Sequence, residues 1–299
     1  MGLLKIRTAK DIVFDTFVIV FMLIIVILTL APFWFSIVGS FNSGLDYLRG
    51  GVFLWPREFT LSNYKAVFSD ITIYNAYIVT ASRTVIGTIT SVLFTAMIAY
   101  GMSRKNLKFK GYYMIFMMIT MFFAGGLVPT YLLYQKLGLL NNFLVYIIPA
   151  LFNVWNMIIM MSFFRTIPET LIESAKMDGA GEYRIFFSFI IPLSKPVLAA
   201  IALFNGVYHW NSYFDAMMFT TDKSLQTIQL FLMRVVTDAS FAHSMGAQAA
   251  ALIPEQAKQI SPETLKLAMM IATTLPILVI YPFLQKYFVK GVMIGSIKE

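Results

Sequence analysis

Polar and aromatic side chains gather in one short stretch of the chain, 205–215, which reads NGVYHWNSYFD. Its candidate binding residues are Asn205, Tyr208, His209, Trp210, Asn211, Tyr213 and Asp215. Aromatic faces combined with amide and carboxylate groups are suited to holding sugars, so the stretch is a candidate path for a polar solute. The alternative is structural: these residues make polar contacts between helices, or an aromatic belt at a membrane surface.

Arg83 is a further candidate, because it lies at the edge of an apolar run. We expect its side chain to extend to the membrane surface; the alternative is that it faces an anionic sugar. Asp215 near a membrane edge is costly unless it is paired or hydrated, so a functional role for it is reasonable.

The chain offers few residues for catalysis or metal binding. It has no cysteine and only two histidines, His209 and His243, which excludes thiolate chemistry and disfavours a zinc site. His209 with Asp215 is too small a cluster for a membrane enzyme. A phosphate loop of the form G-x-x-x-x-G-K-[S/T] is missing from the sequence. We therefore expect a protein that is not an enzyme and binds no metal or cofactor itself.

The composition shows which kind of structure must position these residues. Hydrophobic residues make up 59% of the 299 residues and charged residues only 13%, whereas soluble domains carry about 25% charged residues. The mean hydropathy of +0.74 agrees. These values indicate an integral membrane protein. The net charge of +8 is then explained by basic loops on one side of the membrane, and no nucleic-acid partner is expected.

Six apolar runs are long enough to cross a bilayer as helices, which takes about 20 residues each. They are 16–35, 84–102, 111–135, 143–164, 196–214 and 267–285. The runs are continuously apolar and do not alternate, so helices are favoured over a barrel. The prediction is an all-α, polytopic membrane protein with six transmembrane helices. Breaks are expected at Gly125, Gly126 and Pro129 in the third run, and at Pro276 and Pro282 in the sixth.

Lysine and arginine set the predicted orientation. The N-terminus, the 103–110 loop, the 165–195 loop and the C-terminal tail hold 14 of the 23 basic residues, whereas the longer loops of the other side hold 8. The positive-inside rule then places both termini and the 165–195 loop in the cytoplasm. The two long outer segments, about 39–81 and 220–266, are expected to form short helices, one of them capped by Ser62 or Asn63. The predicted location is the cell membrane.

A charged stretch interrupts the apolar sequence after the fourth run. From Glu173 it reads ESAKMDGAGEYRIFFSFIIPL, and the pattern predicts helix, break, helix. Pro168 and two acids favour the start of the first helix, Gly179 favours its end, and Pro192 stops the second. The expected apolar face of the first helix comprises Leu171, Ile172, Ala175 and Met177. Such a helix can fit into a groove of another protein or, alternatively, rest on lipid headgroups.

The same stretch resembles the EAA loop of ABC importer permeases, whose usual form is E-A-A-x-x-x-G-x(9)-I-x-L-P. Glu173-Ser174-Ala175, Gly179 and Pro192 match that spacing, and Ile190-Ile191 precede the proline. Ser174 replaces the middle alanine, and the leucine follows the proline, as Leu193. Asp178-Gly179-Ala180, AYGMSRKNLKFKG, WNSYFDA and the ending YPFLQKYFVKGVMIGSIKE resemble the MalG-like carbohydrate-uptake permeases. Within that family the likeness is to the group that imports complex oligosaccharides, and it covers about residue 74 to the end.

The resemblance implies a coupling role for this loop. In the family the EAA helix enters a cleft of a cytoplasmic ATPase and turns nucleotide-driven closure into helix rotation. The implied coupling residues are Glu173, Ser174, Ala175, Asp178, Gly179, Ala180 and Pro192. Glu173 would pair with a basic group of the ATPase, Gly179 would be the joint, and Ala175 and Ala180 would allow close contact. Gly291, Gly295 and Lys298 would reach the ATPase from the C-terminus; a frayed tail is the alternative.

The implied protein is one permease subunit of an importer for oligosaccharides or polysaccharide fragments. Its implied partners are a second homologous permease, a cytoplasmic ABC ATPase dimer that binds the ATP and magnesium, and an extracellular or periplasmic solute-binding protein. The predicted parts are 1–70 (cytoplasmic segment, first span and outer loop), 71–290 (permease domain) and 291–299 (cytoplasmic tail). The alternative function is a secondary transporter working without an ATPase, against which the scarcity of ionisable residues in the span cores argues.

Overall fold

The computed structural model describes residues 9–244 and 260–296, and these are helical, with a single bridge between Asn42 and Phe59 in place of any sheet. The chain divides into two compact units. One comprises Met1–Ser69 and Val235–Ala272, and the other comprises Asp70–Arg234 and Thr273–Glu299. Two helices, α13 (Ile228–Ser244) and α15 (Pro262–Ser296), contribute to both units.

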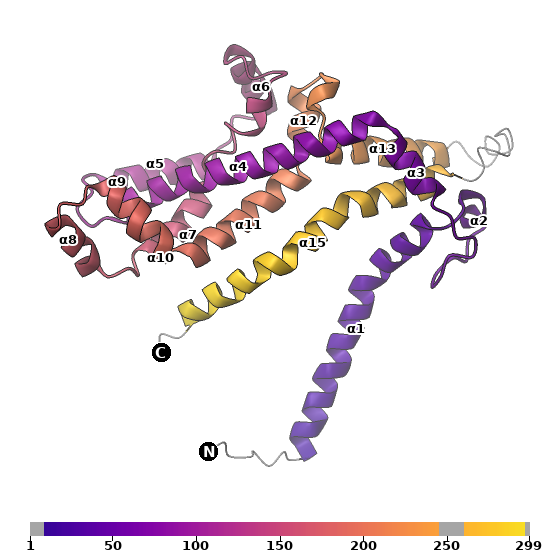
Figure 1. Cartoon of the computed structure of the whole chain (residues 1–299), viewed down its shortest axis with the longest axis horizontal. Helices are drawn as coiled ribbons and strands as arrows, with labels where there is room; N and C mark the ends of the chain where they lie inside the picture. The colour runs from indigo at the N-terminus through magenta and orange to yellow at the C-terminus, as the bar shows by residue number, and fades with distance from the viewer. Residues whose placement is uncertain (1–8, 245–259, 297–299) are drawn as a thin grey trace. The chain divides into compact units, whose positions relative to one another are not determined.

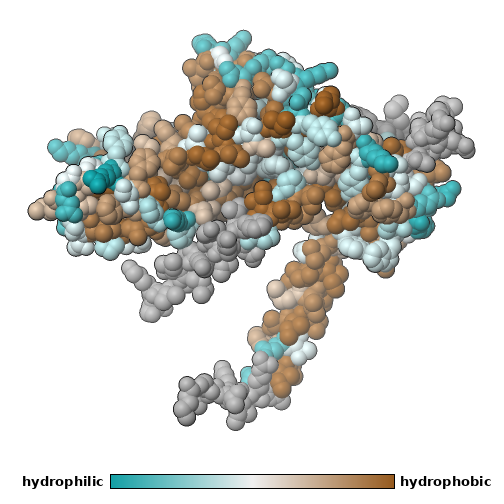
Figure 2. Space-filling model, viewed as in Figure 1, coloured by the Kyte–Doolittle hydropathy of each residue, from teal (hydrophilic) through white to brown (hydrophobic). Residues whose placement is uncertain are grey.

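The first unit contains α1 (Ala9–Ser40), α2 (Gly44–Leu48) and α3 (Ser62–Ser69). Exposed hydrophobic side chains follow α1 from Ile12 to Phe35, and Figure 2 shows them on the face in view. At 1.5 Å per residue the helix is about 48 Å long, more than the roughly 30 Å hydrocarbon core of a bilayer. An apolar surface of this length is stable only in lipid or against another membrane protein.

The segment after α1 is folded around a buried asparagine. The Asn63 amide donates hydrogen bonds to the carbonyl oxygens of Ser40 and Asn42, both at 2.9 Å. Its oxygen accepts one from the Thr264 hydroxyl at 2.9 Å. The expected short outer helices are thus present as α2 and α3. The expected cap is wrong, since the Thr60 hydroxyl accepts the Ser62 N–H at 3.1 Å and Asn63 is committed to tertiary contacts.

The second unit is a helical bundle with short helices at both ends. Its elements are α4 (Ile71–Ser103), α5 (Lys110–Phe122), α6 (Leu127–Lys136), η1 (Phe143–Tyr146), α7 (Val154–Phe164), α8 (Glu169–Met177), α9 (Glu182–Ile185), the π-helix η2 (Phe186–Ile190), α10 (Ile191–Leu193), α11 (Lys195–Asn211), α12 (Phe214–Phe219) and η3 (Lys223–Leu225). Figure 1 shows α7 and α11 beside α4, with α8, α9 and α10 gathered at its end.

Small residues on α4 allow this packing. Gly87, Ser91 and Thr95 recur every four residues, so they lie on one face, and α11 packs closely against α4. The core between α4, α7 and α11 includes the fully buried side chains of Met157 and Ile201. Close helix contact of this kind suits a membrane, where packing and polar contacts hold helices together.

Two expected spans differ from the observed elements. The third run forms α5 and α6, which meet at an angle of 113°; the expected break is confirmed, and Gly126 there adopts a φ of 87°. In the fourth run only α7 is an α-helix. Pro149 interrupts the earlier part, and the Asn153 side chain caps α7 by accepting the Asn156 N–H at 3.0 Å.

The number of observed spans is also smaller than expected. Three described helices are long and apolar enough to cross a membrane, or up to five if each bent pair is one span. The missing one is α7, which at 11 residues is only about 17 Å long. In the sixth run neither Pro276 nor Pro282 ends the helix, because α15 continues through both.

Candidate functional site

The surface helix α8 begins and ends as its sequence predicts. Pro168 precedes the first turn, and Glu169 places a negative charge near the positive end of the helix dipole. Gly179 adopts a left-handed φ of 77°, and the Ala180 N–H donates to the Ala175 carbonyl oxygen at 2.9 Å. These features match the common glycine-terminated helix end, so α8 leaves the membrane bundle as a short, sharply bounded helix.

One face of α8 is anchored and the other is free. Ile172 and Ala175 are buried in the core that α4, α7 and α11 share. Glu173, Ser174, Asp178 and Gly179 are exposed and Ala180 is partly exposed. Met177 was expected on one apolar face with Ile172 and Ala175, but its side chain is 88% exposed and does not share their burial. Ala175 also differs from expectation, since its side chain contacts this chain's own core.

Ion pairs tie the start of α8 to the end of α4. The Glu169 carboxylate lies 2.6 Å from the Lys105 ammonium and 3.5 Å from the Arg104 guanidinium. The hydrogen bond from Lys105 holds the pKa of Glu169 below its ordinary value and raises the pKa of Lys105 in turn. These groups are exposed enough for water to screen them, so their contribution is mainly orientation.

A second link joins the same two regions. Glu182, at the start of α9, accepts a hydrogen bond from the Tyr100 hydroxyl at 2.5 Å and lies 2.5 Å from the Lys176 ammonium. Glu182 therefore connects α4 to the last turn of α8. Neither link to α4 was predicted from the sequence, because Lys105 and Tyr100 lie more than 60 residues before their partners Glu169 and Glu182 and no local pattern marks them.

The passage from α9 to α11 contains two irregularities. The backbone forms a π-helix at Phe186–Ile190 and then bends by 83° between Leu193 and Lys195. Pro192 was expected to stop this helix, which in fact ends one residue later, at Leu193. The Ser194 hydroxyl at the bend is fully buried and makes no hydrogen bond within the described part of the chain. π-Helical turns occur often at functional sites.

At the opposite end of the bundle lies a polar cluster, comprising Arg83, Tyr146, Ser212 and Asp215. Both Arg83 terminal nitrogens donate to the two Asp215 carboxylate oxygens. The Arg83 guanidinium also lies 4.3 Å from the centre of the Tyr146 ring, and the Ser212 hydroxyl donates to Asp215 at 2.9 Å. The Arg83 side chain is 0% exposed. The expectation that Arg83 extends to the membrane surface is therefore wrong.

The cluster has the features that a buried charge requires. A bidentate carboxylate and an aromatic face compensate the guanidinium, which otherwise loses several kcal/mol of hydration. Tyr146 is itself fixed, because its hydroxyl donates to the Leu225 carbonyl oxygen at 2.7 Å. The cluster thereby joins α4, η1 and α12, which are far apart in the sequence.

Three other candidates from the 205–215 stretch contact neighbouring helices. The His209 ring packs against the backbone of Gly87, leaving no space there for a Cβ atom. The Asn205 amide lies 3.4 Å from the Ser91 hydroxyl, and the Trp210 indole N–H donates to the Thr273 carbonyl oxygen at 3.1 Å. These contacts favour the structural alternative for the three residues.

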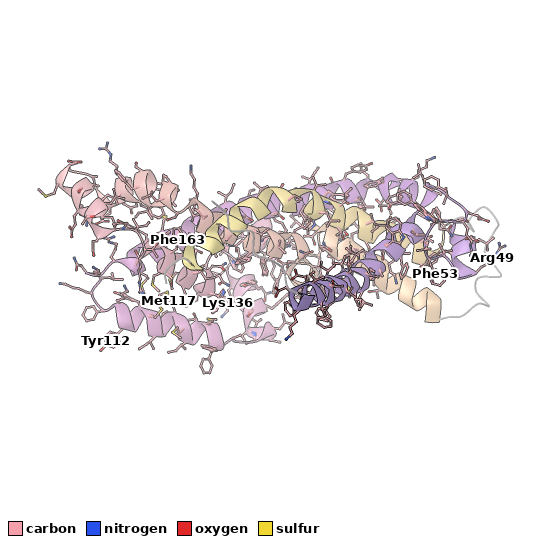
Figure 3. The ribbon with its side chains drawn as sticks, turned by 90° about the horizontal axis from the view of Figure 1, so that it is seen from below. Arg49, Phe53, Tyr112, Met117, Lys136 and Phe163 are labelled. Carbon is pink, nitrogen blue, oxygen red and sulfur yellow. The ribbon has the colours of Figure 1, made fainter. Side chains whose placement is uncertain are left out.

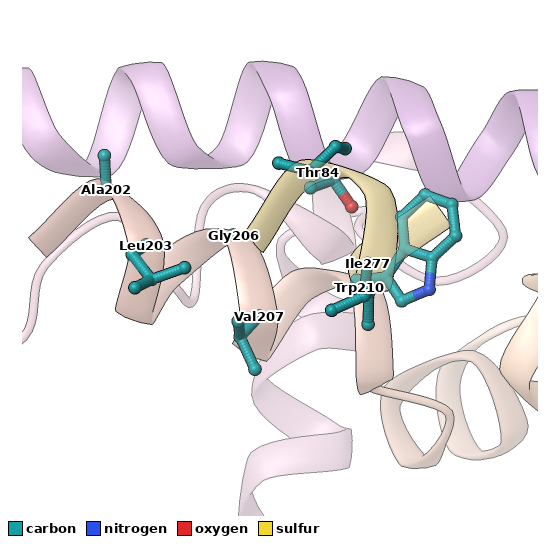
Figure 4. Close-up of a pocket in the computed structure, with 8 residues that line it drawn as sticks. Thr84, Ala202, Leu203, Gly206, Val207, Trp210 and Ile277 are labelled. Atoms are coloured by element: carbon teal, nitrogen blue, oxygen red, sulfur yellow. The ribbon is translucent and has the colours of Figure 1, made fainter. Parts of the chain in front are cut away.

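The remaining candidates are open to solvent or a partner. Tyr208 is 56% exposed and Tyr213 is 37% exposed, and the exposed Asn211 amide lies 3.4 Å from that of Gln229. A nearby cavity of about 80 Å³, shown in Figure 4, is lined by Trp210 and aliphatic side chains, with Thr84 as its one hydroxyl-bearing residue. Such a cavity is too small and too apolar for a sugar. The exposed group is therefore the better candidate contact for a solute.

The expected C-terminal contacts are only partly described. Gly291 and Gly295 lie on the last turns of α15, and Lys298 lies outside the described residues.

A helical, multi-pass membrane chain with paired charges inside its bundle and a rigid helix at its surface has the architecture of a membrane transport component. The chain belongs to the family of binding-protein-dependent transport system inner membrane components, whose model matches residues 109–294. It is accordingly a transporter permease component of the inner membrane, and its family is not one of enzymes.

Comparison with individual proteins agrees over nearly the whole chain. The polygalacturonan/rhamnogalacturonan transport system permease protein YtcP of Bacillus subtilis (strain 168) is 36% identical over 97% of this chain and 99% of its own length. The protein LplC of the same organism is 38% identical over 96% of this chain and 95% of its own. A chain of a bacterial ABC transporter involved in the import of the acidic polysaccharide alginate matches with a TM-score of 0.84 and 30% identity, covering 94% of this chain and 99% of that one.

Proposed function

We propose that this chain is one permease subunit of an ATP-driven, binding-protein-dependent importer for oligosaccharides. It would pair with a second, homologous permease to enclose the path. A dimer of cytoplasmic ATPase subunits would drive it, and a solute-binding protein would deliver the cargo. The observation that carries the proposal is full-length similarity to YtcP and to the alginate importer, combined with an exposed, rigidly held α8.

Six crossings, with both termini in the cytoplasm, belong to this proposal. The bent pairs α5–α6 and α9–α11 would each be one crossing, and α7 would complete another with the 143–153 segment that precedes it. The excess of basic residues on the α8 side supports this orientation.

The mechanism starts at the exposed face of α8. Glu173 and Met177 would contact the ATPase, and Gly179 would fix the angle at which the chain turns back. Movement of α8 would reach α4 through two links, Glu169 to Lys105 and Glu182 to Tyr100. Nucleotide and loaded binding protein would thus shift the populations of inward-open and outward-open states.

The cargo would meet the exposed face of the 205–215 stretch. Tyr208 and Tyr213 offer aromatic faces and Asn211 offers an amide, which suits sugar hydroxyls. YtcP is named for the transport of polygalacturonan and rhamnogalacturonan, and the solved transporter for the import of the acidic polysaccharide alginate. Fragments of such polymers are the first cargo to test. Because Asp215 neutralises Arg83, a cargo carboxylate would not find a free cation in that cluster.

The test is uptake into proteoliposomes that contain this chain, its partner permease, the ATPase and the binding protein. We expect uptake of oligogalacturonides with ATP in the ATPase compartment, and none with a hydrolysis-deficient ATPase. Uptake that persists without ATP and follows an imposed ion gradient would contradict the proposal and favour a secondary transporter.

A further inference from the structure

A pocket of about 290 Å³ lies where the 103–110 loop meets the segment between α7 and α8. Four cationic side chains line it: those of Arg104, Lys105, Lys110 and Arg165. The one carboxylate among its lining residues is that of Glu169. The pocket therefore has a large excess of positive charge, and its volume is enough for a small anion with several waters.

Glu169 compensates only part of this charge. Its carboxylate lies 2.6 Å from Lys105 and 3.5 Å from Arg104, so these two cations share one negative charge. The exposed Lys105 side chain is directed to this pairing, and Arg104 also lies 5.6 Å from the centre of the Tyr100 ring. This half of the pocket therefore keeps one net positive charge.

Lys110 and Arg165 line the other half of the pocket, where no carboxylate among the described residues offsets their charge. The Lys110 ammonium donates to the Arg104 carbonyl oxygen at 3.1 Å, and the Arg165 guanidinium donates to the Met161 sulfur at 3.3 Å. Neither cation has a carboxylate within ion-pair distance in the described part of the chain. A thioether is a weak acceptor, so most of the donor capacity of Arg165 is unused.

Helix ends do not remove the excess. The helices α4 and α7 end at this pocket, and α5 and α8 begin there. Their dipoles contribute about −0.5 charge for each C-terminus and about +0.5 for each N-terminus, so the four helix ends roughly cancel. The four cations and one carboxylate carry three positive charges between them, so the pocket remains cationic.

We propose that this pocket binds a phosphate group, carried by an anionic lipid headgroup or by a soluble phosphate. A guanidinium and an ammonium that line one pocket can both bind the oxygens of a phosphate, and basic pockets between membrane helices are suited to lipid headgroups. Phe109 and Tyr112 beside the pocket are 68% and 73% exposed. Figure 3 shows Tyr112 projecting outward at the start of α5, as expected for an aromatic ring at headgroup level.

A bound phosphate would hold the end of α7 and the start of α5 together. Arg165 lies four residues before Glu169, so the anion would also steady the base of α8. This inference concerns a site apart from the cargo path. It stands whether or not α8 contacts an ATPase.

The test uses the full chain, purified in a non-ionic detergent without phosphate, and native mass spectrometry of the bound species. The probes are phosphatidylglycerol, phosphatidylcholine and inorganic phosphate. The variant is Lys110→Gln/Arg165→Gln. The matched control is Lys108→Gln/Arg184→Gln, which removes the same charge from exposed positions that do not line the pocket.

We expect the wild type and the control to bind phosphatidylglycerol at least tenfold more tightly than the variant does, and more tightly than they bind phosphatidylcholine. Inorganic phosphate that binds and displaces the lipid would identify a soluble anion as an alternative source for the same site. Equal binding by variant and wild type, an equal loss in the control, or no binding of either phosphate probe would overturn the proposal.

A folding control accompanies these measurements. Phosphatidylglycerol should raise the thermal midpoint of the wild type, because a ligand that binds only the folded state stabilises it. It should raise that of Arg165→Gln, the milder variant, distinctly less. The same lipid-induced rise in both proteins would contradict the site even if the double variant fails to fold.

Discussion

The α8 segment (168–193) and the polar cluster around Arg83 handle charge in opposite ways. In the α8 segment most charged side chains are exposed. Glu169 and Glu182 make ion pairs that water screens, and Glu173 and Met177 face outward. In the polar cluster Arg83 is fully buried and held by both oxygens of Asp215. The first region presents the exposed face that we propose meets a partner. The second is built to keep helices of the bundle in register.

This difference predicts where substitutions act. Removing a charge from a buried pair leaves its partner unpaired in a medium of low polarity, and the fold suffers. Removing an exposed charge barely changes stability, so any loss of transport must come from a lost partner contact. The following substitutions test the contrast, in order of decreasing effect on stability.

Asp215→Ala should have the largest effect. It leaves the buried Arg83 guanidinium unpaired, and we expect a loss of about 3–5 kcal/mol, seen as a much lower thermal midpoint of the purified chain. The paired replacement Arg83→Met/Asp215→Leu removes both charges and should be clearly more stable than Asp215→Ala alone. A midpoint equal to that of the wild type in Asp215→Ala would show that the pair is not structural.

Gly87→Ala should be the next most damaging change. A Cβ atom there would lie 2.4 Å from the His209 ring, and overpacking of this kind costs about 1–3 kcal/mol. Gly101→Ala on the same helix is the control, because no atom lies within 4 Å of its added Cβ. Adding His209→Ala to Gly87→Ala should recover part of the loss in thermal midpoint. If Gly101→Ala destabilised the chain as much as Gly87→Ala does, and adding His209→Ala recovered none of the loss, this packing would be refuted.

Gly179→Asp and Glu173→Lys should separate stability from transport. The first places a side chain at a left-handed φ and should cost about 1 kcal/mol. Glu173 is exposed, so its replacement should cost less. Both variants should insert into the membrane normally, and cells that carry either one should take up no oligosaccharide. Normal uptake by both would count against a coupling role for α8.

Glu169→Gln should have the smallest effect, and one that depends on pH. The folded-state pKa of Glu169 is lowered by Lys105, so the stabilisation is present above the unfolded-state pKa, about 4.3. It is lost as the pH falls through the lower folded value. Wild type and variant should therefore differ slightly at pH 7 and converge near pH 3 in thermal midpoint. A difference in thermal midpoint that grows as the pH falls would contradict the stabilising role assigned to the ionised Glu169 carboxylate.

The sequence allowed local features to be predicted well and distant ones poorly. The bounds of α8 and the left-handed Gly179 follow from residues within a few positions of each other, as does the break at Gly126. Arg83 and Asp215 are 132 positions apart, and composition alone gave no reason to pair them. Their pairing depends on how α4 packs in the bundle, which no local pattern encodes.

The prolines show the same limit of local sequence patterns. Pro149 interrupts an apolar run that hydropathy alone predicts as one helix, whereas α15 continues through Pro276 and Pro282. In a membrane bundle neighbouring helices and local backbone adjustment can satisfy the groups that a proline frees. Whether a proline ends a helix is then decided by its surroundings.

The most direct test of the account is disulfide or thiol crosslinking from α8, which is simple because the chain has no cysteine of its own. Met177→Cys, in the assembled complex, should crosslink to the ATPase subunit, and the yield should change when nucleotide is added. Lys136→Cys, at the end of α6, should not crosslink to it. A complex that imports its cargo while Met177→Cys never reaches the ATPase would contradict the central claim.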